Sequence, residues 1–319
     1  MATEMIFAPV QQELSKVEQL LQEVSAVDSP DLATMLTHVL QSRGKRLRPT
    51  ITLLAGHLFH YQPRLHLPAA AAVEILHTAT LVHDDVIDKS PQRRGQATVN
   101  HLWGNDIAIL LGDYLITAAE EMATGTGNLS VTRMLAHTIM AITRAEIEED
   151  FNHFNLRKTP EQYYQQISDK TAELFVTAVA AGAVLGEAST ENVARLQTYG
   201  RNLGMSFQIV DDILDFTSTE AHLGKPVGAD LRQGTITLPV ILFRAKYPQD
   251  KSLPEFVAQC ANTELLQRAI QNVASSSAIS DCYQAAEGYC ARAREALEGL
   301  PEGIFREALA AITELVVAR

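Results

Sequence analysis

The sequence predicts an all-α protein folded as a single-domain helical bundle. Apolar residues recur at intervals of three and four along almost the whole chain, as on one face of a helix, and strand-like alternation is rare. The 319 residues are 46% hydrophobic and 20% charged, which is typical of a globular protein with a sizeable core. No internal repeat or shift in composition marks a boundary, so we expect one domain over residues 1–319.

The first helices follow from this spacing. The pattern predicts helices over residues 11–24, 31–40, 50–59 and 69–88. Pro49 suits the first turn of the third of these, and Pro68 is expected to start the fourth. The fourth helix is apolar or small nearly all round, which predicts that it is buried inside the bundle.

Longer helices are expected in the second part of the chain. The same spacing predicts them over residues 104–120, 131–151, 160–185 and 192–216. The only long irregular stretch expected is 217–235, which contains several glycines and a proline. Shorter helices, interrupted near prolines and serines, are expected in the remainder.

Two acidic clusters end apolar helical runs. They consist of Asp84, Asp85 and Asp88, and of Asp211, Asp212 and Asp215. On a helix, the first and last carboxylates of each cluster share a face, and the middle one lies about 100° round. One such cluster could be a solvated helix face, but two of identical spacing predict a shared site. Facing carboxylates repel each other unless cations lie between them. Mg²⁺ prefers such oxygen ligands, together with substrate phosphates.

Basic residues stand beside these clusters and in a turn near the N-terminus. Each alone is typically a surface charge. In an acidic chain, however, their position next to the clusters favours contacts with a polyphosphate. These residues are Lys45, Arg48, Arg93, Arg94, Lys170 and Lys225.

The overall charge and the cysteine content exclude several classes of protein. A net charge of −12 leaves no basic stripe for general nucleic-acid binding. The three cysteines lack metal-type spacing, so we expect no zinc site or disulfide framework and a cytoplasmic location. No signal peptide is expected, and the longest uncharged run, 174–186, is shorter than the roughly 20 residues of a transmembrane segment. Peripheral contact with a membrane stays open.

A series of ordered motifs runs along essentially the whole chain. It comprises Gly44-Lys45-Arg46-Leu47-Arg48-Pro49, His77, Leu81 to Asp88, Arg93-Arg94-Gly95, Gly112-Asp113, Lys170-Thr171-Ala172, Gly204 to Asp215 and Gly224-Lys225-Pro226. In these motifs the chain resembles the trans-isoprenyl diphosphate synthases of the polyprenyl synthetase family. The resemblance implies the isoprenoid synthase fold around a central cavity. It also implies a prenyltransferase that joins isopentenyl diphosphate to an allylic diphosphate.

The resemblance assigns roles to individual residues. The six aspartates would hold about three Mg²⁺ ions that bind the allylic diphosphate. Arg93, Lys170 and Lys225 would neutralise that diphosphate. Lys170, Thr171 and Gln208 are the expected catalytic residues, and the last two would face the reacting carbons. Isopentenyl diphosphate would be bound by Gly44, Lys45, Arg48, His77 and Arg94. A homodimer is typical of the family.

The positions before the first cluster predict the length of the product. Residues one turn below Asp84 line the space beneath the metals, and short-chain relatives carry aromatic residues there. This chain has Ala79 and Thr80, so we expect a long product of hexaprenyl to decaprenyl class. Close helix packing, which also favours small residues, is the alternative explanation. Two departures from the family pattern are Arg43, in place of a glycine, and Glu149, near where relatives commonly carry glutamine.

Other functions stay open from the sequence. A short-chain farnesyl or geranylgeranyl diphosphate synthase shares the motifs. A terpene cyclase shares the first cluster, but it usually carries a different second cluster and has no second diphosphate for the basic turn. A non-catalytic subunit of a heteromeric synthase would be expected to lose carboxylates, and none is lost. A catalytic subunit that is inactive alone would retain them.

Overall fold

The computed structural model describes residues 6–41, 44–93, 95–219 and 227–318, and nearly all of their regular structure is helical. The elements in chain order are η1 (Ala8–Val10), α2 (Gln11–Val24), α3 (Pro30–Leu40), α4 (Leu47–His57), α5 (Pro63–Ile87), β1 (Gln92–Arg93), β2 (Gln96–Ala97), α6 (Val99–Trp103), α7 (Asn105–Gly125), α8 (Leu129–Asp150), α9 (Pro160–Ile167), η2 (Ser168–Ala172), α10 (Glu173–Leu185), α11 (Thr190–Thr217), α13 (Ala229–Gln233), α14 (Leu238–Lys246), α15 (Ser252–Ala258), α16 (Thr263–Ala274), α17 (Ala278–Ala296) and α18 (Ile304–Val317).

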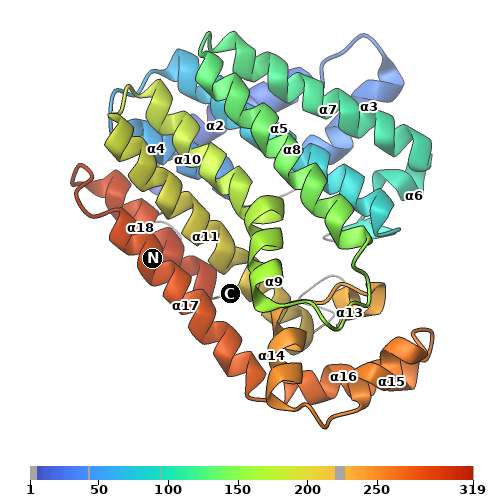
Figure 1. Ribbon diagram of the computed structural model, residues 1–319. Helices are drawn as coiled ribbons and strands as arrows, with labels where there is room; N and C mark the ends of the chain where they lie inside the picture. Colours follow the sequence, from blue (N-terminus) through green and yellow to red (C-terminus); the bar gives the residue numbers. More distant parts are fainter. Residues whose placement is uncertain (1–5, 42–43, 94, 220–226, 319) are drawn as a thin grey trace.

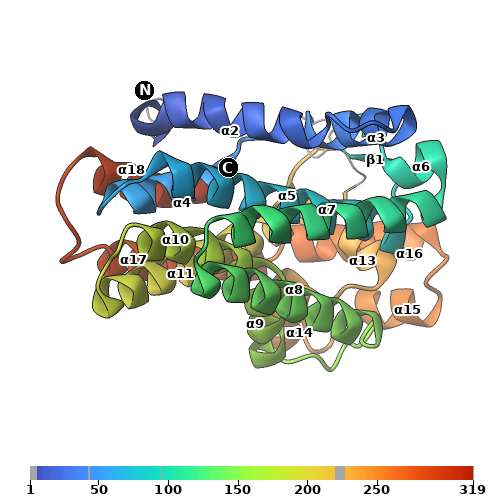
Figure 2. The same cartoon turned by 90° about the horizontal axis from the view of Figure 1, so that it is seen from above.

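The helices lie in layers. Figure 2 shows α2 and α3 in an outer layer, α4, α5 and α7 beneath them, and α8, α10 and α11 on the far side. In Figure 1, α17 and α18 flank α10 and α11, while α14, α15 and α16 gather at one end of the bundle. The helix α5 contacts α2, α4, α7 and α10, so it occupies the centre of the arrangement.

The central helix α5 is buried because small and apolar residues surround its axis. Residues 69–73 are completely buried in the main hydrophobic core. By length and composition α5 could cross a membrane, but 67% of the relevant window is buried inside the protein. This burial is the property expected of the core helix of a bundle.

The predicted start of this helix was wrong. The helix α5 begins at Pro63, and Pro68 lies inside it. Gln62 is extended (φ −126°, ψ 106°), and Pro63 takes the first helical turn, where an N–H has no partner within the helix. Pro68 removes one main-chain donor from the next turn. Burial of the alanines that follow outweighs that loss, so the helix continues.

The helix expected over residues 160–185 is interrupted. The helix α9 ends at Ile167, a π-helical turn spans Ser168–Ala172, and α10 begins at Glu173. Such turns widen the helix locally and are frequent at functional sites. Lys170 and Thr171 lie within this turn, so their directions do not follow the regular helical spacing from which the helix was predicted.

A short hairpin follows α5, although the sequence predicted no strand there. Its strands are antiparallel, with Gln92 opposite Ala97 and Arg93 opposite Gln96. The imidazole Nε2 of His38 on α3 lies 2.8 Å from the carbonyl oxygen of Ala97 and hydrogen-bonds to it. The hairpin is thereby fixed to α3, and it presents Arg93 to the end of α5.

The helix α11 connects two hydrophobic clusters. Leu196 and Leu203 belong to the main core, whereas Ile209 and Ile213 belong to a second core shared with α9, α14, α16 and α17. A long helix that packs into both cores is held rigidly along its length. Its C-terminal end, which carries the second acidic cluster, therefore has a fixed position relative to α5.

We expect Gly182→Ala to destabilise the protein. A Cβ at Gly182 on α10 would lie 2.1 Å from the main-chain oxygen of Thr52 on α4, so the two helices would have to separate. Overpacking of this kind costs about 1–3 kcal/mol of unfolding free energy. Gly125→Ala in α7 is the matched control, because nothing lies within 4 Å of its Cβ. Equal melting temperatures of the two variants in calorimetry would contradict the close contact.

Candidate active site

The first acidic cluster occupies the end of α5. Asp85 is 6% exposed, and its Oδ1 accepts a hydrogen bond from Arg93 Nε at 2.8 Å. Burial raises the pKa of Asp85, and Arg93 opposes that rise. Asp84 is partly exposed to solvent. Burial and the negative charge of Glu146 nevertheless raise its pKa to about 7, against the opposing effect of Lys170.

The second acidic cluster occupies the end of α11. Asp212 is 2% exposed; its Oδ2 accepts a hydrogen bond from the Tyr163 hydroxyl at 2.6 Å, and its Oδ1 accepts one from Gln208 Nε2 at 2.8 Å. Burial and then the negative charge of Asp230 raise the pKa of Asp212 to about 8. Asp215 Oδ2 accepts the main-chain N–H of Asp230 at 3.2 Å, which ties α13 to the end of α11.

The two clusters agree in their first two carboxylates and differ in the third, since Asp215 is buried. In each, the middle carboxylate, Asp85 or Asp212, is buried and hydrogen-bonded to side chains of the protein. The first carboxylates, Asp84 and Asp211, are only partly buried, and Asp88 is exposed. The structure thus distinguishes residues that the sequence spacing treated as equivalent. The partly exposed carboxylates are the better placed to bind a cation from solution.

Three further acidic residues belong to the site. Glu146 and Glu149 come from α8, and Asp230 comes from α13. Burial raises the pKa of Asp88; Lys170 and Arg93 lower it, and the charges of Asp230 and Glu149 raise it further. Because Asp230 also acts on Asp212, α13 brings a carboxylate near both clusters. Sequence reasoning missed Asp230; an aspartate just after Gly228 in the irregular stretch was the available signal.

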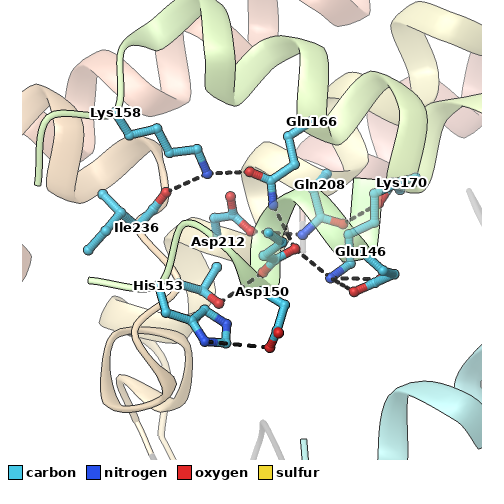
Figure 3. Close-up of polar contacts among 12 residues, drawn as sticks. Glu146, Asp150, His153, Lys158, Gln166, Lys170, Gln208, Asp212 and Ile236 are labelled. Carbon is cyan, nitrogen blue, oxygen red and sulfur yellow. Dashed lines mark hydrogen bonds and ion pairs between the residues drawn. The ribbon is translucent and has the colours of Figure 1, made fainter. Parts of the chain in front are cut away.

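Lys170 is the central cation of this group. Its Nζ lies 2.9 Å from Glu146 Oε1 (Figure 3). It also lies 2.7 Å from Glu149 Oε2. Burial alone would lower the pKa of Lys170, but Glu149 and Glu146 raise it well above its ordinary value. Lys170 also lowers the pKa of Asp84 and of Asp88. The structure therefore places this predicted site residue among the carboxylates.

A chain of polar contacts holds Glu149 in place. Its Oε2 accepts a hydrogen bond from Gln166 Nε2 at 2.6 Å, and its Oε1 accepts one from the Thr235 hydroxyl at 2.9 Å. Gln166 Oε1 in turn accepts from Lys158, whose Nζ also donates to the carbonyl oxygen of Ile236 at 3.0 Å (Figure 3). Burial lowers the pKa of Lys158. Sequence reasoning missed Lys158 and Gln166, because no motif marks either of them.

Thr171 and Gln208 form a second chain of contacts. The Thr171 hydroxyl donates to Gln208 Oε1 at 2.7 Å, and the amide of Gln208 donates to Asp212. This sequence of donors fixes which way the Gln208 amide faces. The family resemblance predicts that both residues face the reacting carbons; the structure brings them together, but their role stays a prediction.

The basic turn lies at the start of α4. Arg48 stacks on Phe175 of α10, with its Cζ 4.6 Å from the ring centroid. Cation–π contacts of this kind hold a guanidinium in a defined orientation. Gly44 and Lys45 precede the helix, and His77 is partly buried on α5. Arg94 and Lys225, also expected to bind diphosphate, lie outside the described residues, as does Arg43.

The residues expected to control product length lie on α5. Ala79 is completely buried in the main hydrophobic core. Thr80 is partly buried, and its hydroxyl donates to the carbonyl oxygen of His77 at 2.8 Å. The two positions therefore differ: Ala79 packs between helices, while Thr80 lies on the same face as Asp84.

Comparison with known proteins decides the family. The family described as Polyprenyl synthetase matches residues 29–273. The chain belongs to the polyprenyl synthetase family. It is a prenyltransferase, as the motifs predicted, and the all-α isoprenoid synthase fold is confirmed.

Individual relatives cover nearly the whole chain. It is 36% identical over 319 residues to heptaprenyl diphosphate synthase component 2 of Bacillus subtilis, which covers 100% of this chain and 91% of the relative. A decaprenyl diphosphate synthase from Rhodobacter capsulatus superimposes with a TM-score of 0.93 at 34% identity, over 99% of both chains. A polyprenyl synthase from Caulobacter crescentus, solved with calcium and isoprenyl diphosphate, superimposes with a TM-score of 0.94 at 31% identity, over 99% of this chain and 98% of that one.

The donor chemistry of the site suits magnesium. The side chains around Lys170 are carboxylates, which are the oxygen donors that Mg²⁺ prefers. Among the described residues, no three acidic, histidine or cysteine side chains form a ready-made metal cage. This arrangement fits a cation bound by a few carboxylates together with substrate phosphates.

Magnesium should therefore stabilise the protein more at about pH 8.5 than at about pH 6. With pKa values of about 7 and about 8, Asp84 and Asp212 shed their protons through this range, which favours cation binding. Without metal, the contribution of Asp84 and of Asp212 to the free energy of unfolding is fully present below the pKa that an aspartate has in the unfolded chain. It is lost as pH rises through the folded value, where a cation would restore it.

Thermal unfolding with and without magnesium chloride at both pH values measures the effect. Sodium chloride at matched ionic strength is the control. An equal rise in melting temperature with either salt, or the same rise at both pH values, would argue against a carboxylate cation site.

Proposed function

We propose that this protein condenses isopentenyl diphosphate with an allylic diphosphate, using Mg²⁺, to give a long-chain all-trans polyprenyl diphosphate. The observation that carries the proposal is the position of Lys170. It lies among carboxylates of α8 and is electrostatically coupled to the cluster on α5. Carboxylates and a buried lysine together suit a diphosphate that arrives with metal ions.

The protein's own residues contribute to the departure of the allylic diphosphate. Breaking the C–O bond leaves negative charge on the diphosphate and positive charge on the allyl group. Bound magnesium would supply the main neutralisation of the leaving group. Lys170 and Arg93 add positive charge from fixed positions, which lowers the barrier because nothing needs to reorganise during the step.

The allylic cation needs stabilisation of the opposite sign. Thr171 and Gln208 would supply oxygen dipoles, and the hydrogen bonds through Gln208 to Asp212 hold the amide in one orientation. The double bond of isopentenyl diphosphate then attacks the cation, and one proton is lost to the released diphosphate. Exclusion of water is essential, since water would convert the cation to an alcohol.

A long product is the length that the sequence and the relatives support best. Neither Ala79 nor Thr80 is an aromatic residue that could block growth beneath Asp84. The relatives named above include a heptaprenyl and a decaprenyl diphosphate synthase. A short-chain synthase is the second candidate, because complete burial of Ala79 equally fits close helix packing.

We propose a homodimer as the working assembly. Large apolar side chains are exposed on adjacent helices: Ile107, Leu110 and Tyr114 on α7, and Met140 and Ile147 on α8. A face of this kind suits a second copy of the chain. The relative that is named a component of heptaprenyl diphosphate synthase makes a heteromeric assembly the alternative. Light scattering of the purified chain distinguishes a dimer from a monomer that needs another subunit.

We further propose one domain over residues 1–319 and a cytoplasmic location. The shared helix α11 supports the first, because it packs into both hydrophobic clusters. The second is supported by the free thiols of Cys260, Cys282 and Cys290.

The purified chain should elongate farnesyl diphosphate with isopentenyl diphosphate when Mg²⁺ is present. Asp84→Asn should lower the rate by about a hundredfold or more, since it removes a carboxylate of the proposed cation site. Asp31→Asn, which changes an exposed aspartate on α3, should keep full activity. Chromatography of labelled products measures both rate and chain length. No condensation by the wild-type chain alone would refute the proposal for the isolated protein.

Thr80→Phe should shorten the product by several isoprene units, because an aromatic ring on the face of α5 that carries Asp84 would fill the path of the growing chain. Ala79→Phe should shorten the product too, but with a lower melting temperature, because Ala79 is completely buried between helices. Thr80→Phe is the milder change, since Thr80 is only partly buried. Product length by chromatography, with melting temperature as the check on folding, measures the effect. Unchanged product length in two folded variants would show that other residues set it.

A further inference from the structure

Arg46 has an unusual backbone and an unusual number of partners. It precedes α4 in the left-handed conformation, with φ 47° and ψ 36°. Residues other than glycine rarely adopt this backbone conformation, so it persists only where surrounding contacts hold the residue in place. Its side chain is 13% exposed, which is low for a residue in the turn that carries Lys45 and Arg48.

The guanidinium of Arg46 uses every nitrogen. Its Nε and Nη2 donate to the carboxylate of Glu18 on α2 at 2.5 and 3.2 Å. Its Nη1 donates to Glu74 Oε1 on α5 at 2.8 Å, and Nη2 also donates to the carbonyl oxygen of Leu40 at the end of α3 at 2.7 Å. One side chain thus connects three helices to the first turn of a fourth.

These partners connect the two chain segments that carry the proposed isopentenyl diphosphate site. Lys45 precedes Arg46, and Arg48 follows two residues later. Glu74 is 7% exposed and lies one helical turn before His77 on α5. The pair formed by Arg46 and Glu74 therefore joins the turn that carries Lys45 and Arg48 to the part of α5 that carries His77.

We propose that Arg46 is a positioning residue for isopentenyl diphosphate, holding the basic turn and the His77 segment at the separation that one diphosphate spans. The inference rests on the proposed function. Arg46 itself need not touch the substrate, because its donors are already bound to protein acceptors. Its effect is on substrate binding. If the contacts of Arg46 were lost and the basic turn moved by about 1 Å, the turn would lose hydrogen bonds to the diphosphate.

Lysine cannot replace Arg46 in this position. Its single ammonium keeps the charge, but it cannot reach Glu18, Glu74 and the carbonyl of Leu40 together with the geometry of a planar fork. Arg46→Lys should therefore leave the charge of the turn unchanged and loosen its placement. This substitution separates positioning from simple electrostatics.

The test compares steady-state kinetics for the two substrates with direct binding. Arg46→Lys should raise KM for isopentenyl diphosphate about tenfold or more, with kcat and KM for farnesyl diphosphate within about twofold of the wild type. Calorimetric titration with isopentenyl diphosphate, without metal, should show a matching rise in Kd. Glu74→Gln, which keeps a hydrogen-bond acceptor but removes the charge, should raise the same KM about threefold.

Arg306→Lys on α18 is the matched control. Arg306 also binds a carbonyl oxygen, that of Leu300 at 3.1 Å, and a carboxylate, that of Glu302 at 3.3 Å. The adjacent Phe305 stacks on His57, at the opposite end of α4 from the basic turn. Its substitution should leave both KM values unchanged.

The outcomes separate this inference from the proposed function. If the wild-type chain does not condense the substrates, the proposed function fails. If the wild type is active but Arg46→Lys lowers only the melting temperature, or raises both KM values equally, Arg46 is merely structural and the inference fails. If Arg46→Lys does not fold, Glu74→Gln decides: an unchanged KM for isopentenyl diphosphate would overturn the inference.

Discussion

Burial of carboxylates at the ends of two helices, together with the repulsion between them, is the constraint on which the site depends. The partial negative charge at a helix C-terminus adds to this repulsion at the ends of α5 and α11. Burial, and then the charges of Glu146 and Asp230, raise the pKa of Asp84 and of Asp212, so the surroundings of both carboxyl groups disfavour their anionic forms. Lys170 supplies positive charge but is shared with Glu146 and Glu149. The remaining positive charge would have to arrive with the ligand, so the unfavourable electrostatics of the protein alone favour the binding of metal ions with diphosphate.

Carboxylates that repel each other stay close together only when the helices that carry them are held rigidly. Close packing of these helices provides that rigidity. A Cβ at Gly204 on α11 would lie 2.5 Å from Cα of Ala172, so only glycine lets α11 approach the π-helical turn this closely. One turn further along α11, Gln208 then comes within 2.7 Å of Thr171. A packing requirement in the core thus sets a hydrogen bond in the site. The same contact places the second acidic cluster opposite the turn that carries Lys170.

Periodicity predicted the elements where burial follows one face of a regular helix. The helix over residues 11–24 was confirmed residue for residue, and both acidic clusters ended helices as expected. The errors have local causes. Pro68 was taken as a helix start, although Pro63 could fill that position and burial carries the helix through Pro68. The π-helical turn leads into α10, which is buried on nearly all sides, so hydrophobic spacing could not show the turn. Within the site, Asp230 and Lys158 escaped prediction because they act through contacts between distant segments rather than through a motif.

The two diphosphates pose a problem of discrimination, since their head groups are identical. If the proposed function holds, the protein discriminates between the two head groups by the opposite charges of their binding sites. A site of carboxylates can accept a diphosphate only together with metal ions, whereas a basic turn accepts one directly. Arg46 contributes to this discrimination between the substrates. Its guanidinium pairs with Glu18 and Glu74, and these pairs fix the basic turn outside the acidic clusters. The substrates are then distinguished by the charge around each head group, and the apolar core beneath α5 acts only on the growing hydrocarbon chain.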